Sequence, residues 1–358
     1  MTAEDLSISV ETAPPPEYGK INVGDLKLES GAVLPGAELA FERAGKKGGP
    51  TILVCHALTG NQYTVGTEEQ PGWWHGLIGP GMYVDTNQYE VITFNVLGGC
   101  SGSTGPTSMN PLTIKPYQYD FPKITIRDIV DSQVLALRKL GIDKIKAAIG
   151  GSLGGMQVLE LATAYPDFAE LIIPMAVTPY LSDYGVAFNT IGRNAIKRDP
   201  AWNGGFYSEG AKISGLEIAR MVGMVTYRTG ALFNQRFNRE LKDGDTFQVE
   251  SYLTYQGQKL SARFDANSYL YLLEAMDSHD IGRGRQGWKK AIEQITAKTL
   301  LLGYTGDLLY PPENVEEIAE ALKKAGKEAD YIEVSTDFGH DGFLAEFSKW
   351  GGILQAAL

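Results

Sequence analysis

Short apolar segments that alternate with helix-like segments are the feature that most limits the folds open to this chain. Each apolar segment is rich in aliphatic residues and ends near a glycine, an asparagine or a histidine, which is typical of a strand buried on both faces. The alternation predicts an α/β fold, with a mostly parallel sheet covered by helices on both faces. The predicted strands are 50–55, 89–95, 145–150, 171–176, 299–303 and 330–334, and the clearest helices are 126–140 and 154–165.

The alternation stops between about residues 181 and 294, where aromatic residues, arginine and glycine replace the buried strands. We predict that this region is a helical lid inserted into the core, which then comprises residues 1–180 and 295–358. Ligands of open α/β sheets bind at the carboxyl ends of the strands, and the lid is expected to cover that edge. The first 20 residues or so are acidic and rich in proline, and they predict a flexible arm rather than a signal peptide.

Charge and cysteine content narrow the function classes. The chain of 358 residues has 32 Lys and Arg against 43 Asp and Glu, a net charge of −11 that argues against a nucleic-acid surface. No apolar stretch is long enough for a membrane span. Cys55 and Cys100 are the two cysteines, and they form neither a disulfide framework nor a metal-binding spacing. We therefore expect a cytoplasmic protein without a metal site.

The segment 150–154, Gly-Gly-Ser-Leu-Gly, fits the pattern G-x-S-x-G. It follows a predicted buried strand and opens a predicted helix, which is the setting of the nucleophile in an α/β-hydrolase fold. A sharp turn there exposes the hydroxyl of Ser152, and the helix N-terminus supplies positive potential where an oxyanion forms. The simpler alternative is a glycine-rich turn with a serine that caps the helix.

A serine nucleophile needs a base, and in this fold the chain order is serine, acid, histidine. The chain contains four histidines. His56 and His75 precede Ser152, and His279 falls in the predicted lid. His340 lies between glycines just beyond the last predicted strand, so we select it as the base.

The acid is expected in the loop after the strand 299–303. Asp307 is in that loop and is our choice. Asp337 is the rival, but it is so close to His340 in sequence that it would need a tight local turn.

The oxyanion hole of this fold uses the N–H of the residue after the nucleophile and one N–H from the loop after an early strand. These requirements select Leu153 and Leu58. His56 lies in the same loop as Leu58, and without a second histidine at ligand spacing we expect a structural role for it.

With these residues in place, the chain resembles the homoserine O-acetyltransferases of the α/β-hydrolase type. The resemblance implies transfer of an acetyl group from acetyl-CoA to the hydroxyl of L-homoserine in methionine biosynthesis. It implies a ping-pong mechanism through acyl-Ser152, with Asp307 as acid and His340 as base. The matching segments, which span nearly the whole chain, are 55–60, 71–74, 78–85, 95–106, 150–157, 193–204, 226–229, 263–272, 307–312 and 339–344.

The resemblance also implies two substrate-binding residues, Arg228 and Asp341. Homoserine is a zwitterion, so a guanidinium suits its carboxylate and a carboxylate suits its ammonium group. Without the resemblance, a lid ion pair for Arg228 and a loop cap for Asp341 would be the simpler interpretations. Leu153 and Thr229 stand where methionine and serine are common in the family, and neither change removes a catalytic group.

Three alternatives keep the same triad. The first two are a succinyl donor and a serine acceptor, and the third is a carboxylesterase. Acetyl-CoA would be a co-substrate, with no bound cofactor, nucleic acid or membrane as partner. The family implies a homodimer formed through the lid, and the segment 216–227 is apolar enough for that and equally able to be core.

Overall fold

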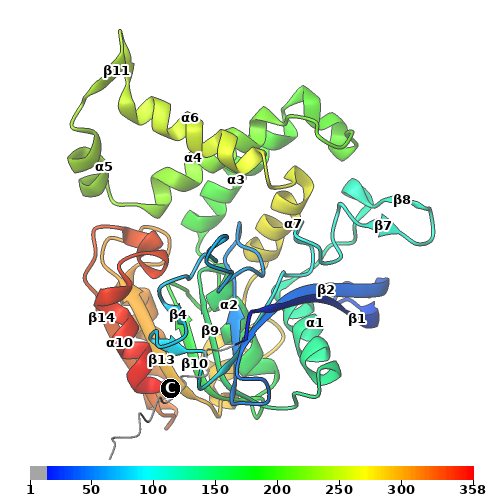
Figure 1. Ribbon diagram of the computed structural model, residues 1–358, viewed down its shortest axis with the longest axis vertical. Helices are drawn as coiled ribbons and strands as arrows, with labels where there is room; N and C mark the ends of the chain where they lie inside the picture. Colours follow the sequence, from blue (N-terminus) through cyan, green and yellow to red (C-terminus); the bar gives the residue numbers. More distant parts are fainter. Residues whose placement is uncertain (1–13) are drawn as a thin grey trace, which may run out of the picture.

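The computed structural model describes residues 14–358, and its centre is an eight-stranded sheet in the order β1-β2-β6-β3-β9-β10-β13-β14 (Figure 1). The six strands from β6 to β14 are parallel to one another. All six were expected from their apolar runs, and the predicted α/β fold is confirmed. They are β3 (Thr51–Cys55), β6 (Glu90–Phe94), β9 (Ile145–Gly151), β10 (Ala169–Met175), β13 (Lys298–Tyr304) and β14 (Ala329–Val334).

The first two strands, β1 (Glu17–Lys27) and β2 (Val33–Gly45), are antiparallel and were not expected. β1 forms the sheet edge, and most of its side chains are at least partly exposed, so no apolar run marks it. Residues 17–20 are therefore not part of a flexible arm, because Glu17 pairs with Arg43 and the ladder continues along β2. Backbone pairing holds this polar segment. Residues 1–13 of the predicted arm lie outside the described residues.

Alternate side chains of the buried strands enter two separate apolar layers. In β3, Leu53 and Cys55 pack in the layer with helices α1 and α2, whereas Ile52 and Val54 pack in the layer with α10. Thr125 caps α1, because its side chain accepts from the Asp128 N–H while the Asp128 carboxylate accepts from the Thr125 N–H. The helices outside the range predicted for the lid are α1 (Ile126–Lys139), α2 (Leu153–Ala164), α9 (Pro312–Lys324) and α10 (Phe347–Ala357), and the short helix α8 (Trp288–Ala291) lies at the end of that range.

The inserted region forms a set of helices over one end of the sheet, drawn in green and yellow at the top of Figure 1. Helix α7 is almost entirely buried and packs into the core layer that contains α1 and α2. Across residues 14–358, we find no helix with the length and apolar character that a membrane crossing requires. The elements of this lid are α3 (Asp183–Lys197), α4 (Ser214–Tyr227), α5 (Gly230–Phe237), β11 (Leu241–Asp243), β12 (Thr246–Phe247), α6 (Gln248–Ser261) and α7 (Ala266–Asp277).

Short elements occur in the loops of the core and of the lid. The loops before α1 hold small strand pairs, and short 3-10 helices mark several loops. These elements are β4 (Ile78–Gly79), β5 (Val84–Asp85), β7 (Met109–Asn110), β8 (Lys115–Pro116), and the 3-10 turns Gln118–Asp120, Pro200–Gly205, Ile292–Gln294 and Gly339–Leu344.

Candidate active site

Ser152 occupies the tight turn between β9 and α2, and its backbone is strained. Its φ of 59° and ψ of −124° lie where an L-residue with a side chain costs about 1–3 kcal/mol. The N–H of Ser152 donates to the carbonyl of Met175 at 3.0 Å, which ties the turn to β10. The side chain is only 6% exposed. This is the elbow geometry that the sequence pattern indicates.

Two glycines make the turn sterically feasible. A Cβ on Gly154 would lie 2.1 Å from the carbonyl oxygen of Cys55, and one on Gly151 would lie 2.5 Å from the ring of Phe343. Neither contact can be relieved without moving backbone or a buried ring. The chain thus requires glycine on both sides of Ser152, because the start of α2 comes close to the last residue of β3.

His340 and Asp307 form a buried hydrogen-bonded pair. The Nδ1–H of His340 donates to Oδ2 of Asp307 at 2.8 Å. The other oxygen of Asp307 accepts the N–H groups of Leu309 at 2.9 Å and Tyr310 at 3.0 Å, so the carboxylate is fixed in orientation. His340 pairs with Asp307 and not with the rival Asp337.

The protonation of His340 follows from this pairing. Burial lowers the pKa of His340, but the charge and the hydrogen bond of Asp307 outweigh it, and the carboxylate of Asp341 acts in the same direction. The net result is a pKa above the ordinary value for histidine. The imidazole is therefore a stronger base than a free histidine.

Aromatic rings surround the imidazole of His340. The ring centroids of Tyr310, Phe343 and Tyr227 lie 5.2, 5.5 and 5.6 Å from that of His340. Burial and the charge of Asp307 raise the pKa of the Tyr310 hydroxyl, so this phenol is neutral. A direct hydrogen bond between Ser152 and His340 is not among the contacts found within residues 14–358. Catalytic hydrogen bonds of this kind often tighten only when substrate is bound.

The two backbone N–H groups assigned to the oxyanion hole lie next to the nucleophile. Leu153 begins α2, where the N–H groups of the first turn have no partner within the helix. Leu58 follows β3 and lines the same cavity as Ser152. Both positions suit donation to a developing oxyanion.

His56 fixes the loop that carries Leu58. Its Nδ1–H donates to the carbonyl of Ala57 at 2.7 Å, and its Nε2 accepts the N–H of Val96 at 3.1 Å. Burial lowers the pKa of His56 to about 4, so the ring is neutral and both contacts persist at neutral pH. These contacts are structural.

Gln157 is a residue of the site that the sequence reasoning did not single out. Its Nε2 donates to the carbonyls of His56 at 3.2 Å and Leu153 at 3.0 Å. Its Oε1 accepts from Nε2 of Gln133 at 2.8 Å. One buried amide thus connects the two segments that supply the oxyanion N–H groups. Only its place one turn after Ser152 could have indicated this role.

Arg228 and Asp341 are brought together as an ion pair next to His340. Nε of Arg228 lies 3.1 Å from Oδ2 of Asp341. The guanidinium also lies 5.9 Å from the ring centroid of Tyr252 and 5.8 Å from that of Phe338. Burial raises the pKa of Asp341, while Arg228 and His340 oppose the shift. Because a guanidinium has five N–H donors, the pair leaves donors of Arg228 for a second carboxylate.

Thr229, the residue after Arg228, joins the lid to the loops that bear the acid and the base. Its hydroxyl donates to the carbonyl of Asp337 at 2.6 Å. A Cβ on Gly306 would lie 2.5 Å from Cγ2 of Thr229, and one on Gly339 would lie 3.3 Å from it. The start of α5 is therefore in close contact with the turns before Asp307 and His340.

A small cavity of about 40 Å³ lies over the nucleophile. Ser152, Leu58 and Leu309 come from the core, and the other lining residues come from α3, α4 and α7 of the lid. The predicted lid thus contributes most of the wall of this cavity.

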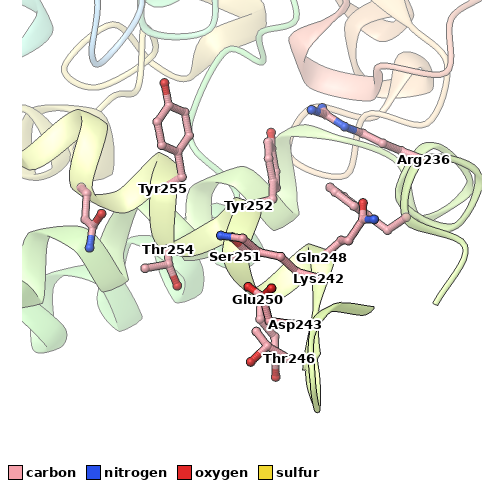
Figure 2. Close-up of a pocket in the computed structure, with 12 residues that line it drawn as sticks. Arg236, Lys242, Asp243, Thr246, Gln248, Glu250, Ser251, Tyr252, Thr254 and Tyr255 are labelled. Carbon is pink, nitrogen blue, oxygen red and sulfur yellow. The ribbon is translucent and has the colours of Figure 1, made fainter. Parts of the chain in front are cut away.

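A larger groove of about 840 Å³ lies at the far end of the lid, around β11, β12 and α6 (Figure 2). It is lined by Arg236 and Lys242 but also by Asp243 and Glu250, and no triad residue borders it. Arg236 lies 4.6 Å from the ring centroid of Tyr252. Of the two hollows, the smaller cavity is the one that Ser152 borders.

Comparison with known proteins agrees with the geometry. Residues 50–346 match the family model of the alpha/beta hydrolase fold. A homoserine O-acetyltransferase from Carboxydothermus hydrogenoformans is 45% identical over 357 residues, which cover 95% of this chain and 94% of that protein.

Two solved structures are also similar over most of their length. The homoserine O-acetyltransferase from Staphylococcus aureus is 37% identical with a TM-score of 0.80, covering 96% of this chain and 95% of that one. Esterase E22 is 27% identical with a TM-score of 0.89, covering 95% of this chain and 99% of that one.

Proposed function

The chain belongs to the homoserine O-acetyltransferase family within the α/β-hydrolase fold, and from this membership we propose that it transfers the acetyl group of acetyl-CoA to L-homoserine. The products are O-acetyl-L-homoserine and CoA, which places the enzyme in methionine biosynthesis. The observation that carries the proposal is the buried Asp307–His340 pair close to the strained Ser152, with the Arg228–Asp341 ion pair beside it.

The first half-reaction acylates Ser152. Nε2 of His340 takes the proton of Ser152 as Oγ attacks the thioester carbonyl, and the N–H groups of Leu58 and Leu153 stabilise the oxyanion. Each such donor lowers the barrier by roughly 3–4 kcal/mol in related enzymes. The C–S bond then breaks, the CoA thiolate receives the proton from His340, and the acetyl group remains on Ser152.

The second half-reaction transfers the acetyl group. His340 takes the proton of the homoserine hydroxyl as its oxygen attacks the acyl carbonyl. The ester bond to Ser152 breaks, and Oγ regains the proton from His340. The chain itself supplies both the acyl carrier and the proton carrier, so we propose that no resident cofactor takes part.

We assign the acceptor site to Arg228 and Asp341. The free N–H donors of Arg228 suit the carboxylate of homoserine, and Asp341 suits its ammonium group. Because Asp341 is adjacent to His340 in the chain, a zwitterion held by this pair has its hydroxyl near the base. Water has no charged groups for the pair to hold, so the pair favours transfer over hydrolysis.

The experiment uses two readouts on the same protein samples, release of nitrophenol from nitrophenyl acetate and formation of O-acetylhomoserine from acetyl-CoA. Ser152→Ala should abolish both, with a loss of about 10⁴-fold or more. Arg228→Lys should raise the KM for homoserine about tenfold or more, with nitrophenol release nearly unchanged. Lysine keeps the positive charge but cannot make the two parallel hydrogen bonds that a guanidinium makes to a carboxylate.

Ser132→Ala, at a buried serine of α1, is the control and should keep both activities. Transfer that survives in Ser152→Ala would contradict the proposed nucleophile. Initial-rate plots that intersect instead of running parallel would contradict the acyl-enzyme. Nitrophenol release without any homoserine transfer would favour the esterase alternative, to which the similarity of esterase E22 lends support.

We further propose a cytoplasmic homodimer that associates through the lid. Ile218 and Val225 on α4 and Tyr255 on α6 are large apolar residues that are each about half exposed or more. An exposed apolar face of this kind is typical of a protein–protein contact. Sedimentation equilibrium would give the subunit number.

A further inference from the structure

The phenol of Tyr252 lies next to the guanidinium of Arg228, and its hydroxyl has no hydrogen-bond partner among residues 14–358. We propose that Tyr252 is a further binding residue of the acceptor site, whose hydroxyl donates to the carboxylate that Arg228 holds. The inference rests on the proposed function and deepens it. It adds a residue of α6 that distinguishes an amino-acid acceptor from a simple amino alcohol.

The hydroxyl of Tyr252 is buried without compensation. It is one of a small number of buried side-chain polar groups in the described part of the chain that form no hydrogen bond. Folding removes water from such a hydroxyl, and a buried donor without an acceptor is unfavourable. Because buried polar groups are normally paired, an unpaired one beside a substrate site indicates that the substrate supplies the partner.

Packing fixes the ring that carries this hydroxyl. The ring centroid of Tyr252 lies 5.2 Å from that of Phe237 and 4.6 Å from the guanidinium carbon of Arg236. Both contacts involve the ring and leave the hydroxyl free. A tyrosine has only two side-chain torsions, so a packed ring presents its hydroxyl in a nearly constant direction and loses little entropy when a ligand binds.

The distance between Tyr252 and Arg228 suits a shared carboxylate. Cζ of Arg228 lies 5.9 Å from the ring centroid of Tyr252. Hydrogen bonds from a guanidinium or a hydroxyl to a carboxylate are each about 2.7–2.9 Å long, so one carboxylate can bridge two groups at this separation. Arg228 uses Nε for Asp341, which leaves its other N–H donors for the acceptor.

The charges around Tyr252 favour an anion beside its hydroxyl. The guanidinium groups of Arg228 and Arg236 both lie near its ring. Two carboxylates, those of Asp243 and Glu250, line the same groove as Tyr252. Glu250 caps the start of α6, and Figure 2 shows the Tyr252 hydroxyl pointing away from both carboxylates. The nearest charges on the side of the hydroxyl are therefore positive.

The hydroxyl and the nucleophile are closed to solvent in the same way. Ser152 is buried, and so is the hydroxyl of Tyr252. An acceptor therefore reaches either group only after the lid helices shift. Since no group of the described chain holds the hydroxyl, such a shift breaks none of its hydrogen bonds, and the entering carboxylate meets a free donor.

The test compares two acceptors with acetyl-CoA as the donor, L-homoserine and its decarboxylated analogue aminopropanol. Both have the hydroxyl and the ammonium group, so the ratio of their kcat/KM values isolates recognition of the carboxylate. Tyr252→Phe removes only the hydroxyl and should lower the homoserine-to-aminopropanol ratio about tenfold or more, because a hydrogen bond to a charged group is lost. Each ratio is measured on one sample, so partial loss of folded protein cancels.

Two phenols outside the site provide matched controls. The Tyr117 hydroxyl is also buried without a partner, but its ring packs in the core against Phe121, so Tyr117→Phe should keep the acceptor ratio. The Tyr271 hydroxyl donates to the carbonyl of Phe121, so Tyr271→Phe should lower the melting temperature and keep the ratio. Tyr252→Phe should leave the melting temperature unchanged or raise it, because the free protein loses no hydrogen bond.

The outcomes separate this inference from the proposed function. A wild type that acetylates neither acceptor would show that the proposed function is wrong, and this inference with it. An unchanged acceptor ratio in Tyr252→Phe, in an enzyme that acetylates homoserine, would show that the hydroxyl does not bind the carboxylate. A fall in melting temperature as large as that of Tyr271→Phe would show that the hydroxyl is paired in the free protein, which also overturns the inference.

Discussion

At the scale of single residues, the basicity of His340 depends on the carboxylate of Asp307. His340 is buried, and burial alone would weaken it as a base. Asp307 reverses the effect because it accepts the Nδ1–H at 2.8 Å while its own position is fixed by the N–H groups of Leu309 and Tyr310. The fixed carboxylate sets both the tautomer and the basicity of the imidazole.

This arrangement predicts the pH dependence of acylation. His340 must be neutral to take the proton from Ser152, so the rate falls as the pH drops through the pKa of His340. Because that pKa is raised, the midpoint of the acid limb should lie above the ordinary value of 6.5. Asp307→Asn should move the midpoint lower and reduce kcat by about 10⁴-fold. The measurement is kcat/KM for nitrophenyl acetate against pH.

Asp337→Asn is the matched control for that experiment, since Asp337 does not pair with His340. It should leave the midpoint unchanged. An acid limb at the same pH in Asp307→Asn as in the wild type would show that the limb belongs to another group.

At the scale of elements, the two N–H groups that we assign to the oxyanion hole come from segments that are far apart in sequence. The β3 loop supplies Leu58 and the start of α2 supplies Leu153. The amide of Gln157 contacts the carbonyls of both segments, and Gln133 of α1 holds that amide in turn. We propose that Gln157 is a positioning residue, because its Nε2 contacts the backbone carbonyls of these two segments.

Gln157→Leu should therefore affect kcat more than KM. The change removes the donor from two buried carbonyls and costs about 1–3 kcal/mol of stability. It also frees the two segments to separate, so we expect kcat to fall about tenfold or more while the KM for acetyl-CoA stays nearly constant. Steady-state kinetics and thermal unfolding measure the two effects.

Thr163→Val gives a matched control on the same helix. The Thr163 hydroxyl donates to the carbonyl of Leu159 at 2.7 Å and is buried. This variant should lose some stability but keep kcat. An equal loss of kcat in both variants would mean that Gln157 acts only through overall stability.

At the scale of the whole molecule, two buried histidines make the fold sensitive to acid. Burial lowers the pKa of His56 to about 4 and that of His279 to about 3. Between those values and 6.5 the unfolded chain binds protons that the folded chain does not, so stability falls as the pH falls. Five carboxyls with raised pKa values act in the opposite sense, namely those of Glu42, Asp128, Asp131, Glu160 and Asp341.

The prediction concerns the difference between a variant and the wild type, in which the contributions of the carboxyls to the pH dependence cancel. His279→Gln removes one titrating group, and the slope of unfolding free energy against pH between 4 and 6.5 should decrease by about one proton, or about 1.4 kcal/mol per pH unit. Urea unfolding at several pH values measures it. A slope identical to that of the wild type would show that His279 is protonated in the folded protein.

The sequence was sufficient for the buried strands and for the pairing of Asp307 with His340, because each is marked locally by an apolar run or by its place after a strand. β1 could not be found, since a half-exposed edge strand carries polar side chains and is held by backbone pairing. The lid was predicted as helical, but its contacts were not. The Arg228–Asp341 ion pair and the cavity beneath Gly192 depend on the approach of segments that are distant in sequence.

The contact of Thr229 with the turns at Gly306 and Gly339 has a consequence for how such enzymes diversify. Since residue 229 belongs to the insertion while 306 and 339 belong to the core, the insertion is not a cassette that recombination can exchange freely. A chimera with a foreign insertion and a bulkier residue at 229 would push apart the very turns that hold the acid and the base. We therefore expect a chimera to keep the Asp307–His340 pair only where the residue at 229 is no larger than threonine.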